Sequence, residues 1–246
     1  MGLAASRTQA QALIRTGRVL VDDIPVEKPG TRVREAAEVR LRGEVPRFVS
    51  RGGDKLAGAL HDLSIDVRGC YCLDIGASTG GFTDCLLQAG AQSVVAIDVG
   101  YGQLHLRLRA DPRVHVLERT HVRDLRREDL THPGEECGLA VPIDWVTIDV
   151  SFISLRRVLP RVVELVPAAQ VLALVKPQFE VGKERVGRGG VVRDEADRAA
   201  AVAAVAACAD ELGYTVMSQA ESRLPGPKGN REVFLHLCPL RRALVP

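Results

Sequence analysis

Residues 72–86 read C-L-D-I-G-A-S-T-G-G-F-T-D-C-L, and this stretch decides the fold. Residues 71–75, which overlap the start of this stretch, are largely apolar and predict a buried strand. Gly76, Gly80 and Gly81 break that strand, and we expect a helix to begin at Phe82. A strand, a glycine turn and a helix in this order bring backbone N–H groups and the positive end of the helix against a ligand.

Two acidic residues near this turn indicate which ligand it holds. Asp98 closes the next apolar strand about 24 residues after Asp74, a spacing that suits a carboxylate accepting hydrogen bonds from ribose hydroxyls. The glycines are spaced G-x-x-x-G-G instead of G-x-G-x-x-G. Asp74 would repel a pyrophosphate but suits the ammonium of an amino acid. These features predict S-adenosylmethionine, a nucleoside that carries an amino acid and no phosphate; the alternative is an ordinary glycine-rich turn of an α/β protein.

Alternating strands and helices predict a mostly parallel sheet with helices on both faces, and ligands bind at the carboxyl ends of such strands. Asp149 and Lys176 lie at two further strand ends, and Pro177 keeps the backbone of Lys176 extended. A structural salt bridge between the two is the alternative. Lys55 stands in the first turn of a helix, where a positive charge is unfavourable. That position indicates a functional role for Lys55, although a solvated lysine on the surface would account for the position equally well.

The predicted cofactor site combines strand ends, the glycine turn and the loop after Asp98, whose glycines would let Tyr101 reach over the ligand. Its residues are Asp74, Gly76, Ala77, Ser78, Thr79, Gly80, Gly81, Phe82, Asp98, Val99, Tyr101 and Asp149.

The length and composition limit the class of protein. A chain of 246 residues can hold one α/β domain and a small appendage. No apolar run approaches the ~18 residues of a membrane span, and we expect no signal peptide. The six cysteines form no C-x-x-C pair and no metal-ligand spacing. We therefore expect a cytoplasmic protein with reduced thiols, no metal and no membrane contact.

The N-terminal part is basic and is predicted to bind RNA. Residues 1–51 hold ten Lys or Arg and six Asp or Glu, a net charge of +4, whereas the remainder carries −2. The order S-R-T-Q-A-x-x-L-I-R-T-G-R-V-L-V-D-D (6–23) resembles a small RNA-binding fold first known from a ribosomal protein, and we expect its first helix to be missing. The predicted division is a module at 1–45, a linker at 46–50 and a catalytic domain at 51–246. The predicted RNA contacts are Arg7, Arg15, Arg18, Arg32, Arg34 and Arg51.

With Lys55, Asp149, Lys176 and Glu232 in view, the chain resembles the TlyA family of ribosomal RNA 2′-O-methyltransferases, whose catalytic part is similar to the FtsJ-like group. Six collinear motifs carry the resemblance: S-R-G-G-D-K-L (50–56), D-I-G-A-S-T-G-G-F (74–82), D-V-G-Y-G-Q-L (98–104), D-V-S-F-I-S-L (149–155), L-V-K-P-Q-F-E-V-G (174–182) and P-G-P-K-G-N-R-E (225–232).

This resemblance implies a Rossmann-like α/β methyltransferase with a seven-stranded sheet. It further implies that S-adenosylmethionine is used to methylate a cytidine ribose in ribosomal RNA, of the small and in some members also the large subunit. Lys176 would act as the general base for the ribose hydroxyl, and Asp149 would orient it. Lys55 and Glu232 would position the ribose. Ribosomal RNA or ribosomal subunits are then the expected partner, and a monomer is favoured.

The sequence leaves three rival functions open. The first is methylation of a small molecule or a protein. The second is membrane activity, since some relatives carry a haemolysin label; the lack of a spanning segment or a strongly amphipathic basic helix argues against a pore. The third is an RNA-binding scaffold without catalysis, against which the four residues Lys55, Asp149, Lys176 and Glu232 argue.

Overall fold

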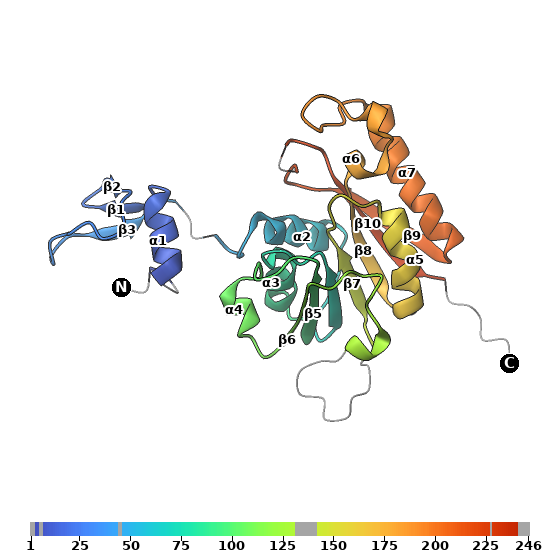
Figure 1. Cartoon of the computed structure of the whole chain (residues 1–246), viewed down its shortest axis with the longest axis horizontal. Coiled ribbons are helices and arrows are strands. Elements are labelled where there is room, and N and C mark those ends of the chain that lie inside the picture. The colour runs from blue at the N-terminus through green and yellow to red at the C-terminus, as the bar shows by residue number, and fades with distance from the viewer. Residues whose placement is uncertain (1–2, 5–6, 44–45, 131–141, 227, 241–246) are drawn as a thin grey trace. The chain divides into compact units, whose positions relative to one another are not determined.

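The structure, a computed structural model, describes residues 3–4, 7–43, 46–130, 142–226 and 228–240 (Figure 1). The chain divides into two compact units, Met1–Arg47 and Phe48–Pro246.

The N-terminal unit is a small α+β fold. Its helix α1 (Arg7–Arg15) is followed by a three-stranded antiparallel sheet of β1 (Val19–Val21), β2 (Ile24–Val26) and β3 (Val39–Leu41), in the order β2-β1-β3. Asp22 and Asp23 join β1 to β2 with positive φ angles of 49° and 65°. Two such residues form a tight hairpin turn that Asn, Asp and Gly tolerate best.

The second unit is built on a seven-stranded sheet in the order β6-β5-β4-β7-β8-β10-β9. Five strands are parallel: β4 (Tyr71–Ile75), β5 (Ser93–Asp98), β6 (Val114–Glu118), β7 (Trp145–Ile148) and β8 (Gln170–Val175). The last two, β9 (Tyr214–Glu221) and β10 (Val233–Pro239), pair antiparallel, and β10 also runs antiparallel to β8. The predicted Rossmann-like, mostly parallel seven-stranded sheet is confirmed. The strand order reverses at β4, so a ligand crevice is expected where β4 and β7 end.

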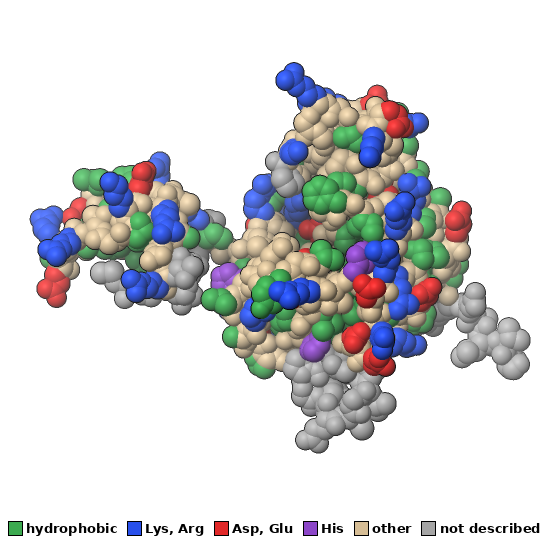
Figure 2. Space-filling view, viewed as in Figure 1, with side chains coloured by type: hydrophobic (Ala, Val, Ile, Leu, Met, Phe, Trp, Pro, Cys, Tyr) green, Lys and Arg blue, Asp and Glu red, His purple; other side chains and the backbone are tan. Residues whose placement is uncertain are grey.

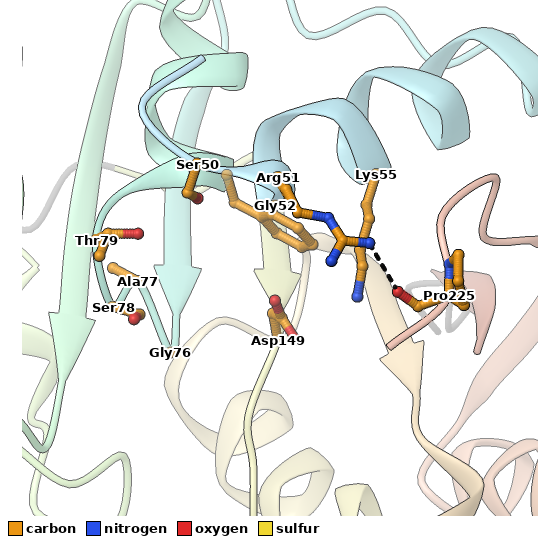
Figure 3. A pocket seen from close by; sticks show the side chains of 12 residues that line it. Ser50, Arg51, Gly52, Lys55, Gly76, Ala77, Ser78, Thr79, Asp149 and Pro225 are labelled. Carbon is orange, nitrogen blue, oxygen red and sulfur yellow. Dashed lines mark hydrogen bonds between the residues drawn. The ribbon is translucent and has the colours of Figure 1, made fainter. Parts of the chain in front are cut away.

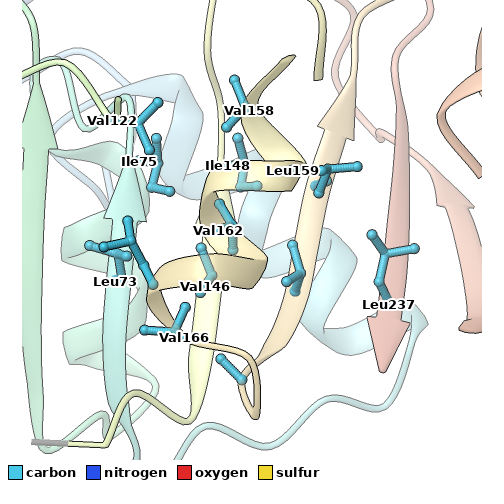
Figure 4. Packing of buried hydrophobic residues seen from close by; sticks show 14 of the residues in the cluster. Leu73, Ile75, Val122, Val146, Ile148, Val158, Leu159, Val162, Val166 and Leu237 are labelled. Atoms are coloured by element: carbon cyan, nitrogen blue, oxygen red, sulfur yellow. The ribbon is translucent and has the colours of Figure 1, made fainter. Parts of the chain in front are cut away.

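Helices cover both faces of this sheet, because alternate strand residues point to opposite sides. Leu73 and Ile75 pack with α5 (Leu155–Leu165) and α7 (Glu195–Glu211), as Figure 4 shows for α5. Cys72 instead packs in the cluster formed with α2 (Arg51–Asp62), α3 (Gly81–Gln88) and α4 (Leu106–Arg109).

Three short elements complete the unit: α6 (Pro177–Glu180) and the 3₁₀ turns η1 (Arg127–Asp129) and η2 (Lys183–Arg185). Within the ranges that the structure describes, no helix is both long enough and apolar enough to cross a membrane.

Candidate active site

The glycine turn after β4 is held tightly against the neighbouring strands. Gly76 has a φ of 89°, and a Cβ atom there would lie 2.6 Å from the carbonyl oxygen of Asp149, so only glycine fits. The amides of Gly76 and Ala77 both donate to the carbonyl of Ile97, at 2.9 and 3.1 Å. The turn therefore lies at the carboxyl ends of β4, β5 and β7 together.

Asp98 is fixed beside this turn at the end of β5. Its Oδ2 accepts a hydrogen bond from the amide of Ser78 at 2.8 Å, and its Oδ1 accepts one from the amide of Gly100 at 2.7 Å. Each carboxylate oxygen has a second lone pair. The side chain can therefore accept further hydrogen bonds from a ligand while it keeps those from Ser78 and Gly100.

Three neighbouring cavities open along this edge of the sheet, and Asp149 forms part of the wall of each. The turn cavity, about 340 Å³, lies between the start of α2 and the glycine turn (Figure 3). The edge cavity, about 680 Å³, lies beyond the ends of β4 and β5 and includes Asp98 and His121. The lysine cavity, about 510 Å³, includes Lys55, Lys176 and Glu232.

Two lysine–carboxylate pairs line the lysine cavity. Lys176 Nζ lies 2.6 Å from Asp149 Oδ1 and donates to Ser151 Oγ at 3.0 Å. Lys55 Nζ donates to Glu232 Oε2 at 2.5 Å. The side chains of Lys55 and Glu232 are 9% and 1% exposed, so Lys55 is not a solvated surface lysine. Residues from α2, from the ends of β7 and β8, and from the approach to β10 are thus brought into one cavity.

Comparison with known proteins agrees with this geometry. Residues 48–238 match the family of FtsJ-like methyltransferases, and residues 1–39 match the S4 domain. The chain is 50% identical over 238 residues to the 16S/23S rRNA (cytidine-2′-O)-methyltransferase TlyA of Mycobacterium tuberculosis, a match that covers 96% of this chain and 85% of that protein. The chain belongs to the TlyA family of FtsJ-like methyltransferases.

Other members of the TlyA family carry a different name. Hemolysin A of Brachyspira hyodysenteriae is 35% identical over 236 residues, which cover 96% of this chain and 95% of that protein. A solved structure described as a hemolysin of Streptococcus thermophilus superposes with a TM-score of 0.76 at 39% identity, over 98% of this chain and 85% of that one.

Most of the predicted cofactor residues line the turn cavity or the edge cavity. Gly76, Ala77, Ser78, Thr79, Gly81, Phe82 and Asp149 line the first, and Gly76, Ser78, Asp98, Val99 and Asp149 line the second. Gly80 is not among the residues that line either cavity; it forms the N-cap of α3 with a φ of 96°. Tyr101 is exposed and packs its ring under the guanidinium of Arg119, at 4.1 Å, and does not line these cavities.

Asp74 lies elsewhere than predicted. Because it alternates with Leu73 and Ile75, its side chain points to the α3 face of the sheet, where it is fully buried. Its oxygens accept hydrogen bonds from Thr83 Oγ1 at 2.7 Å and Thr147 Oγ1 at 3.0 Å. Burial, with a smaller effect from the charge of Asp149, raises the pKa of Asp74 to about 7. Asp74 is not among the described residues that line the three cavities, so the structure offers no direct contact to a ligand's ammonium.

Several residues that line the cavities were not found from the sequence. Some of them lie within the six motifs without having been predicted as site residues: Ser50 in the turn cavity, Gln103 in the edge cavity, and Phe152, Gln178, Phe179, Lys228 and Asn230 in the lysine cavity. Thr120, Arg123 and Arg157, in the edge cavity, lie outside these motifs.

Glu180 joins the loop that carries Asp149 to the loop that carries Lys176. Its buried carboxylate accepts hydrogen bonds from Ser154 Oγ at 2.6 Å and from the amide of Leu155 at 2.7 Å, at the start of α5. Burial raises the pKa of Glu180. These contacts fix the two loops side by side, and the Lys176–Asp149 distance with them.

The predicted RNA-contacting arginines fall in both units. Arg7, Arg15, Arg32 and Arg34 are exposed in the N-terminal unit, Arg18 there is half-buried, and Arg34 pairs with Asp22. Arg51 belongs to the second unit, where it lines the turn cavity and donates to the carbonyl of Pro225 at 3.3 Å (Figure 3). No cluster of His, Cys, Asp and Glu that could hold a metal lies among the described residues. Five cysteines are free thiols, and Cys137 is outside the described residues.

Proposed function

We propose that the protein uses S-adenosylmethionine to methylate the ribose 2′-hydroxyl of a cytidine in ribosomal RNA, of the small subunit, the large subunit or both. The observation that carries the proposal is the position of Asp149. It borders two cavities at the ends of β4 and β5 and also pairs with Lys176 in a third cavity. A methyl donor and its acceptor must meet at such a junction.

The residues around the turn cavity and the edge cavity fit this cofactor. Asp98 has free lone pairs for the two ribose hydroxyls. Ile97, Val122 and Ile153 supply apolar surface for the adenine ring in the edge cavity. Ser50 and the turn from Gly76 to Thr79 would surround the amino-acid end. The cofactor supplies a methyl group that is already activated on a sulfonium, so the protein has to bind, orient and remove a proton.

The lysine cavity would hold the target ribose. Lys176 would act as the general base that takes the proton of the 2′-hydroxyl, since Asp149 and Ser151 fix its amino group. Lys55 Nζ donates a hydrogen bond to Oε2 of Glu232, whereas Oε1 of Glu232 is buried and has no hydrogen-bond partner among the described residues. That oxygen can accept a hydrogen bond from a ribose hydroxyl, so Lys55 and Glu232 would position the substrate.

RNA binding would be shared between the two units. Residues 1–39 match the S4 domain and present exposed arginines, and Figure 2 shows Lys and Arg side chains over the visible face of this unit. Phosphate contacts of this kind position a protein without reading sequence. The relatives named as methyltransferases of ribosomal RNA cytidines supply the target class.

The test is to incubate purified ribosomal subunits with the protein and labelled S-adenosylmethionine, and to map methylated nucleotides by mass spectrometry. We expect a 2′-O-methyl group on a cytidine, and methylation slower by about 10²-fold or more with Lys176→Ala. A methyl group on a base or on a ribosomal protein would contradict the proposal. Leakage from liposomes treated with the same preparation tests the membrane-active alternative.

A further inference from the structure

Besides Asp149 Oδ1, which lies 2.6 Å from Lys176 Nζ, two acceptor oxygens in the lysine cavity are left without donors among the described residues. Glu232 Oε1 and Gln178 Oε1 are both buried, and neither receives a hydrogen bond from the residues that the structure describes. A buried acceptor without a donor costs free energy, so native proteins seldom retain one without a reason. A ligand with hydrogen-bond donors in two separate places would satisfy both oxygens.

The two oxygens suit different parts of a nucleotide. Glu232 is held by Lys55 and belongs with the ribose in the proposed function. Gln178 lies in α6, two residues after the proposed base, and precedes Phe179. The ring of Phe179 contacts the ring of Phe152 with a centroid distance of 5.3 Å, and both line the same cavity.

Phe152 is presented in an unusual way for an aromatic residue. Its backbone has a φ of 64°, and the residue is 92% exposed at the border of the edge cavity and the lysine cavity. An L-residue with a side chain of this size seldom adopts that conformation, which persists only where surrounding structure imposes it. Exposed aromatic rings are the surfaces on which proteins stack unpaired RNA bases. The side of the cavity that holds Gln178 is thus the side suited to a nucleobase.

We propose that Gln178 reads the base of the target nucleotide, with its Oε1 accepting a hydrogen bond from the exocyclic amino group of cytosine. This inference rests on the proposed function. A glutamine amide offers one acceptor beside two donors, and cytosine presents its amino group beside the acceptor N3. One side chain can therefore match both groups, as enzymes do when they read the Watson–Crick edge of a base held out of its stack.

The experiment combines one protein change with one substrate change. Gln178→Met keeps an unbranched side chain of similar length and removes the amide. The matched substrate is an RNA fragment in which the target cytidine is replaced by pyrimidin-2-one riboside, which lacks only the amino group. We expect loss of the amino group to lower kcat/KM about tenfold in the wild type, the effect of one hydrogen bond, and less than about twofold in Gln178→Met.

Further measurements separate reading of the base from a structural role. On the cytidine substrate, Gln178→Met should lose about tenfold in kcat/KM, mainly through KM for RNA, with unchanged affinity for S-adenosylmethionine. Gln219→Met, at an exposed position on β9, is the control and should change neither value.

Two results would overturn the inference: equal rates of the wild type on both substrates, or an equal loss in Gln178→Met and in the wild type when the amino group is removed. Equal wild-type rates overturn the inference even if Gln178→Met fails to fold. Absence of 2′-O-methylation of cytidine by the wild type would instead reject the proposed function, and this inference with it.

Discussion

Replacement of Lys176 is the sharpest test of the chemistry, because a general base and a structural salt bridge predict opposite results for arginine. Lys176→Ala should lose methylation by about 10²-fold or more, the usual contribution of a positioned base. Lys176→Arg keeps the positive charge and can pair with Asp149, yet a guanidinium does not release its proton at usable pH. We therefore expect the arginine variant to be nearly as inactive as the alanine variant.

The exposure of the Lys176–Asp149 pair determines how much stability is lost when the pair is removed. The side chains of Lys176 and Asp149 are 11% and 23% exposed, so water screens the pair in part. Loss of the pair in Lys176→Ala should cost about 1–2 kcal/mol of unfolding free energy, which lowers Tm by roughly 2–8 °C in a unit of this size. A 10²-fold loss of rate corresponds to about 2.7 kcal/mol in the activation barrier and is measured well below Tm.

The assay follows methylation of ribosomal subunits at saturating cofactor, together with calorimetry of cofactor binding and thermal melts of each variant. We expect cofactor affinity near the wild-type value in both variants. An active Lys176→Arg protein, with Lys176→Ala losing activity only in step with its stability, would refute the general-base role and leave Lys176 a structural residue.

Three further predictions concern the cofactor, the buried acid and the RNA. Asp98→Ala should bind S-adenosylmethionine at least about tenfold more weakly by calorimetry, and an unchanged affinity would remove Asp98 from the cofactor site. Because burial raises the pKa of Asp74 from 3.8 to about 7, the folded state binds this proton more tightly than the unfolded state does. The free energy of unfolding therefore falls as the pH rises from about 4 to about 7. Urea unfolding should show the wild type losing about 2–3 kcal/mol more than Asp74→Asn between pH 5 and pH 8; parallel curves would contradict the assignment. RNA affinity should fall steeply with salt, and changing both Arg15 and Arg32 to Gln should reduce the salt slope by about two, whereas an unchanged slope would place the phosphate contacts elsewhere.

The sequence predicted the sheet and much of the site because both depend on local signals. Apolar runs separated by glycines and helical segments define parallel strands, and the carboxyl ends of such strands meet at one edge. Asp98, Asp149 and Lys176 could therefore be placed near one another without coordinates. Lys55 was indicated by an unfavourable charge in the first turn of a helix, and its burial against Glu232 supplies the reason.

Other features depended on geometry that spacing does not define. β4 continues to Ile75, one residue past Asp74, and this single residue puts Asp74 on the face toward α3 and away from the ligand edge. The alternation of the apolar residues Leu73 and Ile75 indicates that Asp74 points to the opposite face of the sheet. A prediction based only on strand ends overlooks this indication. Gln178 lies within the motif at 174–182 but was not predicted as a site residue, because its place in a cavity wall depends on how separate segments of the chain meet.

The position of Lys176 is set by the fold before any substrate arrives. Its amino group is held by Asp149 and Ser151 on the loop after β7, and Glu180, four residues along, binds the start of α5 beyond that same loop. The two loops lie together because β7 and β8 are adjacent and in parallel register. Because the amino group of the proposed base is already fixed, no conformational entropy is lost in orienting it when the substrate binds. This advantage exists only in the folded chain. The strand ends visible in the sequence thus carry the groups proposed to react, whereas contacts such as that of Glu180, between residues far apart in the chain, hold these groups in alignment.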